Sequence, residues 1–241
     1  MGEIFHLVVS KLLFIIKMSR TDLDKSMSFM VIRVSKSDIG DWGELRKLLR
    51  FFHCTLKEQS SFGAKNIEEI FTLVDASYAV HIDMKIQTGG EISMVLRVTL
   101  CKSSKKKLKI KRSTESELVD ANDYVPCNIW YILFIYHQAY LNKSNNFFQY
   151  NQSAIRMDIN GINSCTGNSR HINIRYFLIK DRVERGELSI MYCPKYLMLA
   201  DYFTKTQQGK LCSLFRDIVI GGVSPYTLIE DIVSYLSKER V

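Results

Sequence analysis

The chain has 241 residues, of which 46% are hydrophobic and 24% are charged, with only 3 Pro and 12 Gly. This composition is typical of a globular protein and excludes collagen-like, low-complexity and disordered chains. Lys and Arg number 33 against 25 Asp and Glu, and the net charge of +8 favours a polyanionic partner such as nucleic acid.

Residues 5–18 read FHLVVSKLLFIIKM, an apolar run that could be mistaken for a signal peptide or an anchor. Lys11 and Lys17 interrupt this run, which is shorter than the ~20 residues of a membrane span. It has no basic leader region and no small-residue cleavage site. We therefore predict a buried or half-buried helix. We also expect an intracellular protein of the cytoplasm or nucleus, with no signal peptide, transmembrane helix or membrane partner.

Apolar residues recur at helical spacing up to about residue 57, most clearly over 41–54, and predict three helices. Residues 57–65 are polar and contain Gly and Ser, which is typical of a linker. We therefore expect a domain boundary near residue 65.

The following residues predict an antiparallel meander, with strands over 71–80, 92–100 and 106–112 and a turn at Gly89–Gly90. Helices and strands then alternate. The elements expected there are a helix over 113–136 kinked at Pro126, a strand over 146–150, a helix from Gln152, a helix over 172–185 ended by Gly186, a strand over 187–193 and a helix over 196–203. This order predicts an α/β protein with a mixed five-stranded sheet flanked by helices.

The cysteines form no C-x-x-C pair and have no His at zinc spacing, so we expect neither structural zinc nor a disulfide framework. Scattered cysteines in apolar stretches are most often small core residues. The six are Cys54, Cys101, Cys127, Cys165, Cys193 and Cys212.

Three carboxylates lie where a buried acid needs a metal ion or another partner. Asp75 is in the middle of the first predicted strand, with an edge position or a turn as the alternative. Glu117 opens the helix after the third strand, although Thr114-x-x-Glu117 also has the spacing of a capping box. Asp201 lies one step off an apolar helical stripe, where a partly exposed acid is the alternative.

Seven segments, in order and spacing, resemble the C-terminal ribonuclease H domain of copia-type retrotransposon polyproteins. They are Val74–Val80 (VDASYAV), Thr88–Gly90 (TGG), Lys102–Leu118 (KSSKKKLKIKRSTESEL), Asn151–Ile155 (NQSAI), Arg170–Glu187 (RHINIRYFLIKDRVERGE), Tyr192–Pro194 (YCP) and Ala200–Lys205 (ADYFTK). The residues before 57 look like the segment that joins a reverse transcriptase to that domain. No Y-x-D-D motif occurs, so we expect no polymerase activity.

The resemblance implies a ribonuclease H-like fold in three parts. Residues 1–65 would be a helical segment resembling the end of a reverse transcriptase, 66–210 the ribonuclease H-like domain and 211–241 a C-terminal helical tail. The family cleaves the RNA strand of RNA–DNA hybrids with two Mg²⁺ ions about 3.5–4 Å apart, held by oxygen ligands. The resemblance also implies the rest of a retrotransposon polyprotein as a partner.

By the same resemblance, Asp75 would bridge both ions, and Glu117 and Asp201 would help to hold the second. The family's Asp that holds the first ion is Tyr150 in this chain. A phenol, with an ordinary pKa near 10, is a poor substitute for a carboxylate, and its ring is larger than the site. We therefore expect a weak or incomplete Mg²⁺ site and an impaired or inactive enzyme.

We expect the strands that hold Asp75 and Tyr150 to be parallel neighbours at ~4.8 Å. Three other acids lie near in sequence: Asp120 and Asp123 belong to the Glu117 helix, and Asp158 should point elsewhere. None is expected to replace the missing carboxylate. Further departures from the family are Thr21 and Thr206 in place of Pro, and Asn173 in place of Asp.

Residues 102–112 carry seven basic side chains and no acid. They are expected either to form a solvated face or to contact the phosphates of an RNA–DNA hybrid or other nucleic acid. The seven are Lys102, Lys105, Lys106, Lys107, Lys109, Lys111 and Arg112. His171 could also contact phosphate, with a structural role at a helix start as the alternative. The aromatic residues Trp130, Tyr131, Phe147 and Phe148 are expected in the core.

Two other functions stay open on sequence grounds. One is a non-catalytic nucleic-acid-binding or assembly fragment of a decayed element, in which the basic segment is the only retained activity. The other is an integrase-like member of the same fold superfamily, against which the segment 113–118 (STESEL) argues. A shared fold does not decide between them.

Overall fold

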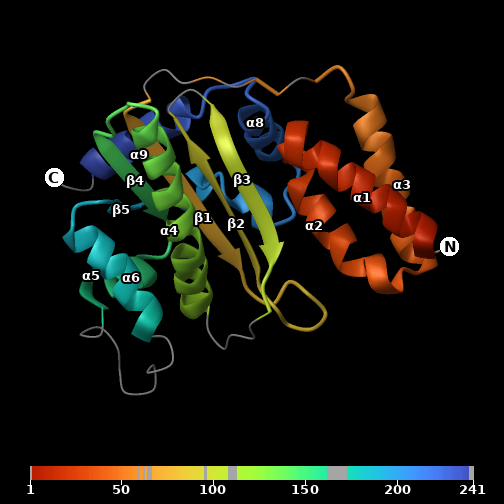
Figure 1. Cartoon of the computed structure of the whole chain (residues 1–241), viewed down its shortest axis with the longest axis horizontal. Coiled ribbons are helices and arrows are strands. Elements are labelled where there is room, and N and C mark those ends of the chain that lie inside the picture. The colour runs from red at the N-terminus through yellow and green to blue at the C-terminus, as the bar shows by residue number, and fades with distance from the viewer. Residues whose placement is uncertain are drawn as a thin grey trace.

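The structure is a computed structural model that describes residues 2–58, 60–61, 63, 67–94, 97–107, 113–161 and 173–238, with the backbone alone for 173–177. It is an α/β protein with one five-stranded mixed sheet flanked by helices (Figure 1). The elements are α1 (Gly2–Ser19), η1 (Thr21–Leu23), α2 (Asp24–Arg33), η2 (Val34–Lys36), α3 (Ile39–Cys54), β1 (Glu69–Ser77), β2 (Gln87–Ser93), β3 (Val98–Lys105), α4 (Ser113–His137), β4 (Ser144–Gln149), α5 (Gln152–Asn160), α6 (Asn173–Glu184), β5 (Ser189–Tyr192), η5 (Lys195–Leu197), α7 (Asp201–Thr204), α8 (Gly209–Val219) and α9 (Tyr226–Lys238).

The sheet has the strand order β3-β2-β1-β4-β5. β1, β2 and β3 form the expected antiparallel meander, and β4 and β5 then add in parallel beside β1. Because β1 lies in the centre, its residues are covered on both sides, and eight of its nine residues are buried. The carboxyl ends of the parallel strands β1 and β4 meet at one edge of the sheet, which positions the candidate site.

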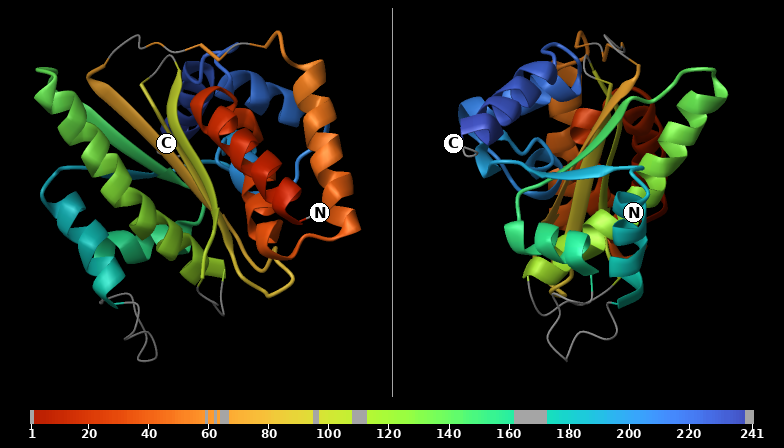
Figure 2. Two further views of the ribbon diagram at one scale, coloured as in Figure 1. Left: turned by 45° about the vertical axis from the view of Figure 1, so that its right-hand side comes forward. Right: turned by 90° about the vertical axis from the view of Figure 1, so that its left-hand side faces the viewer.

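Alternate residues of β1 point into two separate cores. On one face, Ile70 and Val74 pack with the α4 residues Tyr124 and Val125. On the other face, Phe71 and Leu73 belong to the core that α8 and α9 complete. Figure 2 shows α4 and α9 on opposite sides of the sheet. The residues expected as a C-terminal tail thus pack on the sheet.

The N-terminal helices α1 to α3 form their own core, and α2 packs against the edge strand β3. Phe5, Leu12 and Leu45 are among the buried residues of that core. Asp24 of α2 accepts a hydrogen bond from the backbone N–H of Ser103 on β3 at 2.8 Å, which joins the helical segment to the sheet. The boundary expected near residue 65 lies among residues 64–66, outside the described ones.

Several expected boundaries are wrong. Gly89 and Gly90, which were expected to form a turn, lie inside β2. A side chain would not fit at either position, because Phe203 lies against Gly89 and Tyr124 lies against Gly90. The second and third strands accordingly lie at residues 87–93 and 98–105, earlier than expected, and residues 106 and 107 follow the end of β3. The helix expected over 196–203 is the short turn η5 followed by α7 of four residues.

Some expected core residues lie at the surface. Trp130 is exposed on α4, where it stacks on Phe134, whereas Phe147, Phe148 and Tyr131 are buried as expected. Of the five described cysteines, Cys193 alone is fully buried, and all five are free thiols. Cys165 and His171 lie outside the described residues. Among the described helices, none is both long and apolar enough to cross a membrane.

Candidate acidic site

Asp75 is a fully buried acid near the carboxyl end of the central strand β1. It pairs in register with Gly89 of β2, so the alternative of an edge or turn position is wrong. Its Oδ2 accepts a hydrogen bond from the hydroxyl of Thr204, and its Oδ1 accepts one from the ammonium of Lys205 at 2.9 Å. The cost of burying this carboxylate is therefore met by a hydroxyl and a cation from α7 and the residue after it.

Glu117 reaches the same edge of the sheet from the first turns of α4. Its side chain is almost fully buried. The Oε1 atom accepts from the Tyr150 hydroxyl at 2.7 Å and Oε2 accepts from the backbone N–H of Ala76, beside Asp75, at 3.2 Å. Because both carboxylate oxygens bind groups of other elements, the capping-box alternative does not describe this side chain.

Asp201 is the first residue of α7 and is 6% exposed, so the alternative of a partly exposed helical acid is wrong. Its Oδ1 accepts from the Lys205 ammonium at 2.6 Å. The same ammonium therefore joins Asp201 to Asp75, two acids that are 126 positions apart in the sequence. All three predicted acids lie at one site.

Tyr150 follows β4 directly, at the position where the family resemblance expects a carboxylate. β1 and β4 are parallel neighbours, as predicted, with Leu73 opposite Phe148. Continuing this register by two residues brings position 150 beside Asp75. The phenol is half-buried, its hydroxyl donates to Glu117, and the Lys205 ammonium lies 4.9 Å from the centre of its ring.

Burial and the charge of Asp75 disfavour the ionised forms of Glu117 and Asp201. Burial raises the pKa of Glu117 well above its ordinary value, and the charge of Asp75 adds to this effect, whereas the hydrogen bond from Tyr150 opposes it. Burial and the charge of Asp75 likewise raise the pKa of Asp201 to about 6, against the effect of Lys205. Burial and the charge of Glu117 raise the pKa of Tyr150, so the phenol stays neutral and supplies no negative charge.

Three further residues of the site were missed by the sequence prediction. Lys205 and Thr204 bind Asp75 directly. Asp120, expected merely to share the Glu117 helix, is buried, and its pKa is raised by burial and then by the charges of Glu117 and Asp75. The i,i+4 spacing of Asp201 and Lys205 was the one available signal for the lysine.

The resemblance implies a two-Mg²⁺ centre at these acids, but the groups that bind the acids in the structure do not suit one. Hard oxygen ligands suit Mg²⁺. Here, however, the Lys205 ammonium lies between Asp75 and Asp201, and the Tyr150 hydroxyl binds Glu117. Among the described residues, no three His, Cys, Asp or Glu side chains are placed to share a metal ion. With the Lys205 ammonium on two of the acids and the Tyr150 hydroxyl on the third, the residues present do not fit the pair of Mg²⁺ ions that the resemblance implies.

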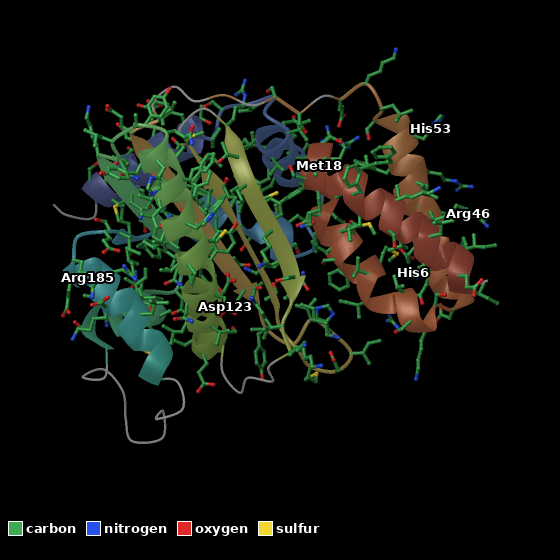
Figure 3. The ribbon with its side chains drawn as sticks, viewed as in Figure 1. His6, Met18, Arg46, His53, Asp123 and Arg185 are labelled. Atoms are coloured by element: carbon green, nitrogen blue, oxygen red, sulfur yellow. The ribbon has the colours of Figure 1, made fainter. Side chains whose placement is uncertain are left out.

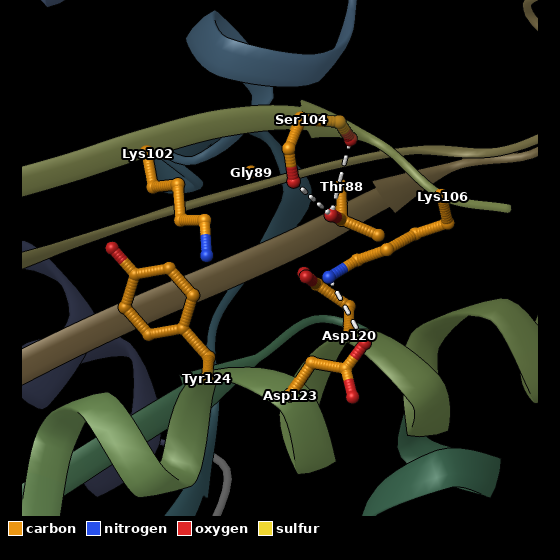
Figure 4. A pocket seen from close by; sticks show the side chains of 8 residues that line it. All are labelled: Thr88, Gly89, Lys102, Ser104, Lys106, Asp120, Asp123 and Tyr124. Carbon is orange, nitrogen blue, oxygen red and sulfur yellow. Dashed lines mark hydrogen bonds and ion pairs between the residues drawn. The ribbon is translucent and has the colours of Figure 1, made fainter.

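A small pocket, open to solvent, lies between α4 and the strands β2 and β3 (Figure 4). Lys102 and Lys106 of the basic segment line it, and Lys106 pairs with Asp123 at 2.9 Å. Asp120 also lines it, and one of its carboxylate oxygens has no hydrogen-bond partner among the described residues. The pocket therefore holds charges of both signs.

The described part of the basic segment lies on the edge strand β3 and just beyond it. Lys102 and Lys107 are exposed, and Lys105 pairs with Asp83 at 2.9 Å. The other predicted contacts, Lys109, Lys111 and Arg112, lie outside the described residues.

A scan against protein-family models finds none that matches this chain.

Proposed function

We propose that the chain is a ribonuclease H-like domain derived from a copia-type retrotransposon, intracellular in the cytoplasm or nucleus. It keeps the fold but cleaves RNA–DNA hybrids poorly or not at all. Support comes from three acids gathered at the ends of two parallel strands, together with the ordered motifs of the sequence. The single observation that carries the loss of activity is the hydrogen bond from the Tyr150 hydroxyl to Glu117.

This hydrogen bond reverses the role expected at position 150. A carboxylate there would present negative oxygens to a cation, whereas the phenol donates a proton to an acid of the site and occupies its Oε1. Because its pKa is raised by burial and by Glu117, the hydroxyl is not ionised near neutral pH. The site consequently lacks the negative charge of one carboxylate ligand, and Glu117, a second expected ligand, has one oxygen hydrogen-bonded to Tyr150.

Binding of a hybrid is proposed to depend on its phosphates. Lys102 and Lys107 are exposed at the edge of the sheet, and the chain carries a net charge of +8. A-form-like duplexes are bound mainly through phosphates and 2′-hydroxyls, which basic side chains contact without reading sequence. Because Lys105 and Lys106 are already paired with acids, we expect this binding to be weak.

The test is hydrolysis of a labelled RNA–DNA hybrid in Mg²⁺ or Mn²⁺ by the native chain and by Tyr150→Asp. A carboxylate restores a ligand charge, so the variant should cleave faster, by roughly 10²-fold if the charge contributes as one preorganised electrostatic group does. Tyr150→Phe is the matched control. It removes the hydroxyl but adds no charge, and it should stay as inactive as the native chain.

Two outcomes would refute this proposal. Efficient cleavage by the native chain that is abolished by Asp75→Asn would show that Tyr150 does not impair the site. No gain in Tyr150→Asp, with the fold preserved in circular dichroism, would show that the missing carboxylate is not the limiting lesion.

The second candidate is a non-catalytic nucleic-acid-binding or assembly fragment. The ion pairs of Lys205 with Asp75 and Asp201 favour it, because they neutralise the acids without any external ion. If this function is correct, hybrid binding should weaken steeply with salt and with Lys102→Gln, whereas Tyr150→Asp should bring no cleavage.

A further inference from the structure

The Lys205 side chain enters the acidic site as a cation. Its Nζ lies 2.9 Å from Oδ1 of Asp75 and 2.6 Å from Oδ1 of Asp201. The side chain is only 29% exposed, and Asp75 is fully buried. An ammonium between two carboxylate oxygens takes the position that a bound cation would take between the same oxygens.

Tyr150 supports the ammonium from a third side. The ring centre lies 4.9 Å from Nζ, within the range of a cation–π interaction. A carboxylate at this position could not offer a ring face. The lysine belongs to the Ala200–Lys205 segment that resembles the family, so what distinguishes this chain is the aromatic ring beneath the lysine.

The charges show why the site needs a cation. The Lys205 ammonium pairs with both acids, of which Asp75 is fully buried and Asp201 is 6% exposed. Removing the ammonium would leave a fully buried carboxylate beside a second buried acid, an arrangement that is strongly destabilising.

A cation that belongs to the chain differs from a bound metal ion because its presence does not depend on the metal concentration in solution. A metal ion stabilises a fold only when its free concentration exceeds its dissociation constant. The lysine is part of the chain, so its ammonium is present at every metal concentration. Its position is fixed by α7, which it directly follows and whose Thr204 also binds Asp75. The acids can therefore stay together when no divalent ion is bound.

We propose that the Lys205 ammonium, held against the Tyr150 ring, is a built-in cation that replaces a divalent metal ion between Asp75 and Asp201. Removing the lysine opens a divalent-cation site at these two acids. The expectation of a metal ion between these acids rests on the proposed function, but the test measures stability without nucleic acid, so its failure is distinguishable from a failure to cleave hybrid.

The experiment is thermal unfolding of the full chain, followed by circular dichroism, in EDTA and in MnCl₂. The native chain should have the same Tm in both. Lys205→Gln should have a lower Tm in EDTA, and MnCl₂ should raise it; an ion at ten times its dissociation constant raises the Tm of a chain of this size by roughly 3–6 °C. Lys210→Gln is the control, because Lys210 is exposed on α8, and it should behave as the native chain does.

A second variant covers the case in which Lys205→Gln fails to fold in EDTA. Asp75→Asn combined with Lys205→Gln removes one charge of each sign, so it should fold in EDTA and show no response to MnCl₂. A native Tm that rises with MnCl₂ would overturn the proposal, as would a Lys205→Gln variant that is as stable as the native chain in EDTA. Failure of the double variant to fold would also overturn it, because the lysine would then be needed for something other than charge.

Discussion

The buried Glu91 carboxyl allows a quantitative test of how the stability of the fold depends on pH. The residue lies in the middle of β2, between Leu73 of β1 and Cys101 of β3. It is fully buried, and neither carboxylate oxygen has a hydrogen-bond partner among the described residues. Burial raises its pKa from 4.5 to about 8, so the side chain is mostly protonated at neutral pH.

The sign of the pH dependence follows from this raised pKa. The folded state binds the proton more tightly than the unfolded state, so the stability is fully present below about pH 4.5 and is lost as the pH rises to about 8. At about 1.36 kcal/mol per pH unit, the loss between pH 5 and pH 8 is on the order of 3.5 kcal/mol. Glu91→Gln keeps the shape of the side chain and removes this loss.

Urea unfolding of the native chain and of Glu91→Gln, each measured from pH 5 to pH 8, gives the free energy of unfolding of both. The difference between them should grow by roughly 3.5 kcal/mol across this range, in favour of Glu91→Gln. Glu184→Gln, an exposed change on α6, should show no such growth. A difference between Glu91→Gln and the native chain that stays constant with pH would refute the assignment of Glu91 as a protonated, unpartnered acid.

Two further substitutions test the packing around the sheet and the N-terminal helices. Gly89→Ala would place a Cβ atom 2.6 Å from the Cβ of Phe203, so it should lower the free energy of unfolding by about 1–3 kcal/mol in urea unfolding. Arg20→Ala would remove the side chain that donates two hydrogen bonds to the buried Asp22, and it should lower the free energy of unfolding by about 3–5 kcal/mol. The control is Arg46→Ala, because Arg46 is exposed on α3 (Figure 3). A loss below about 0.5 kcal/mol in either would contradict the contacts described.

The order of the strands and helices could be predicted from hydrophobic periodicity, because strands and helices bury residues at different spacings. The turn between β1 and β2 could not be predicted from the sequence. Its backbone bends at Ala79 and Met84, which have positive φ, and neither residue type signals such a conformation. Gly89 and Gly90, which do suggest a turn, are instead needed where Phe203 and Tyr124 lie against the strand.

The site could be predicted in its acids but not in its partners. Asp75 stood out because an acid in the middle of a hydrophobic strand is unfavourable without a partner. Glu117 and Asp201 gained support from the family resemblance, whereas their local patterns equally suited a cap and an exposed face. The contact of Lys205 with Asp75 spans 130 positions of sequence, and local periodicity carries no information on such a contact.

Anomalous scattering by manganese, measured on a crystal of the native chain soaked in MnCl₂, would show directly whether the acids hold metal ions. With the Tyr150 hydroxyl on Glu117 and the Lys205 ammonium on Asp75 and Asp201, we expect no pair of manganese peaks at these acids. Two fully occupied peaks about 3.5–4 Å apart among the three carboxylates, with the lysine displaced, would contradict it.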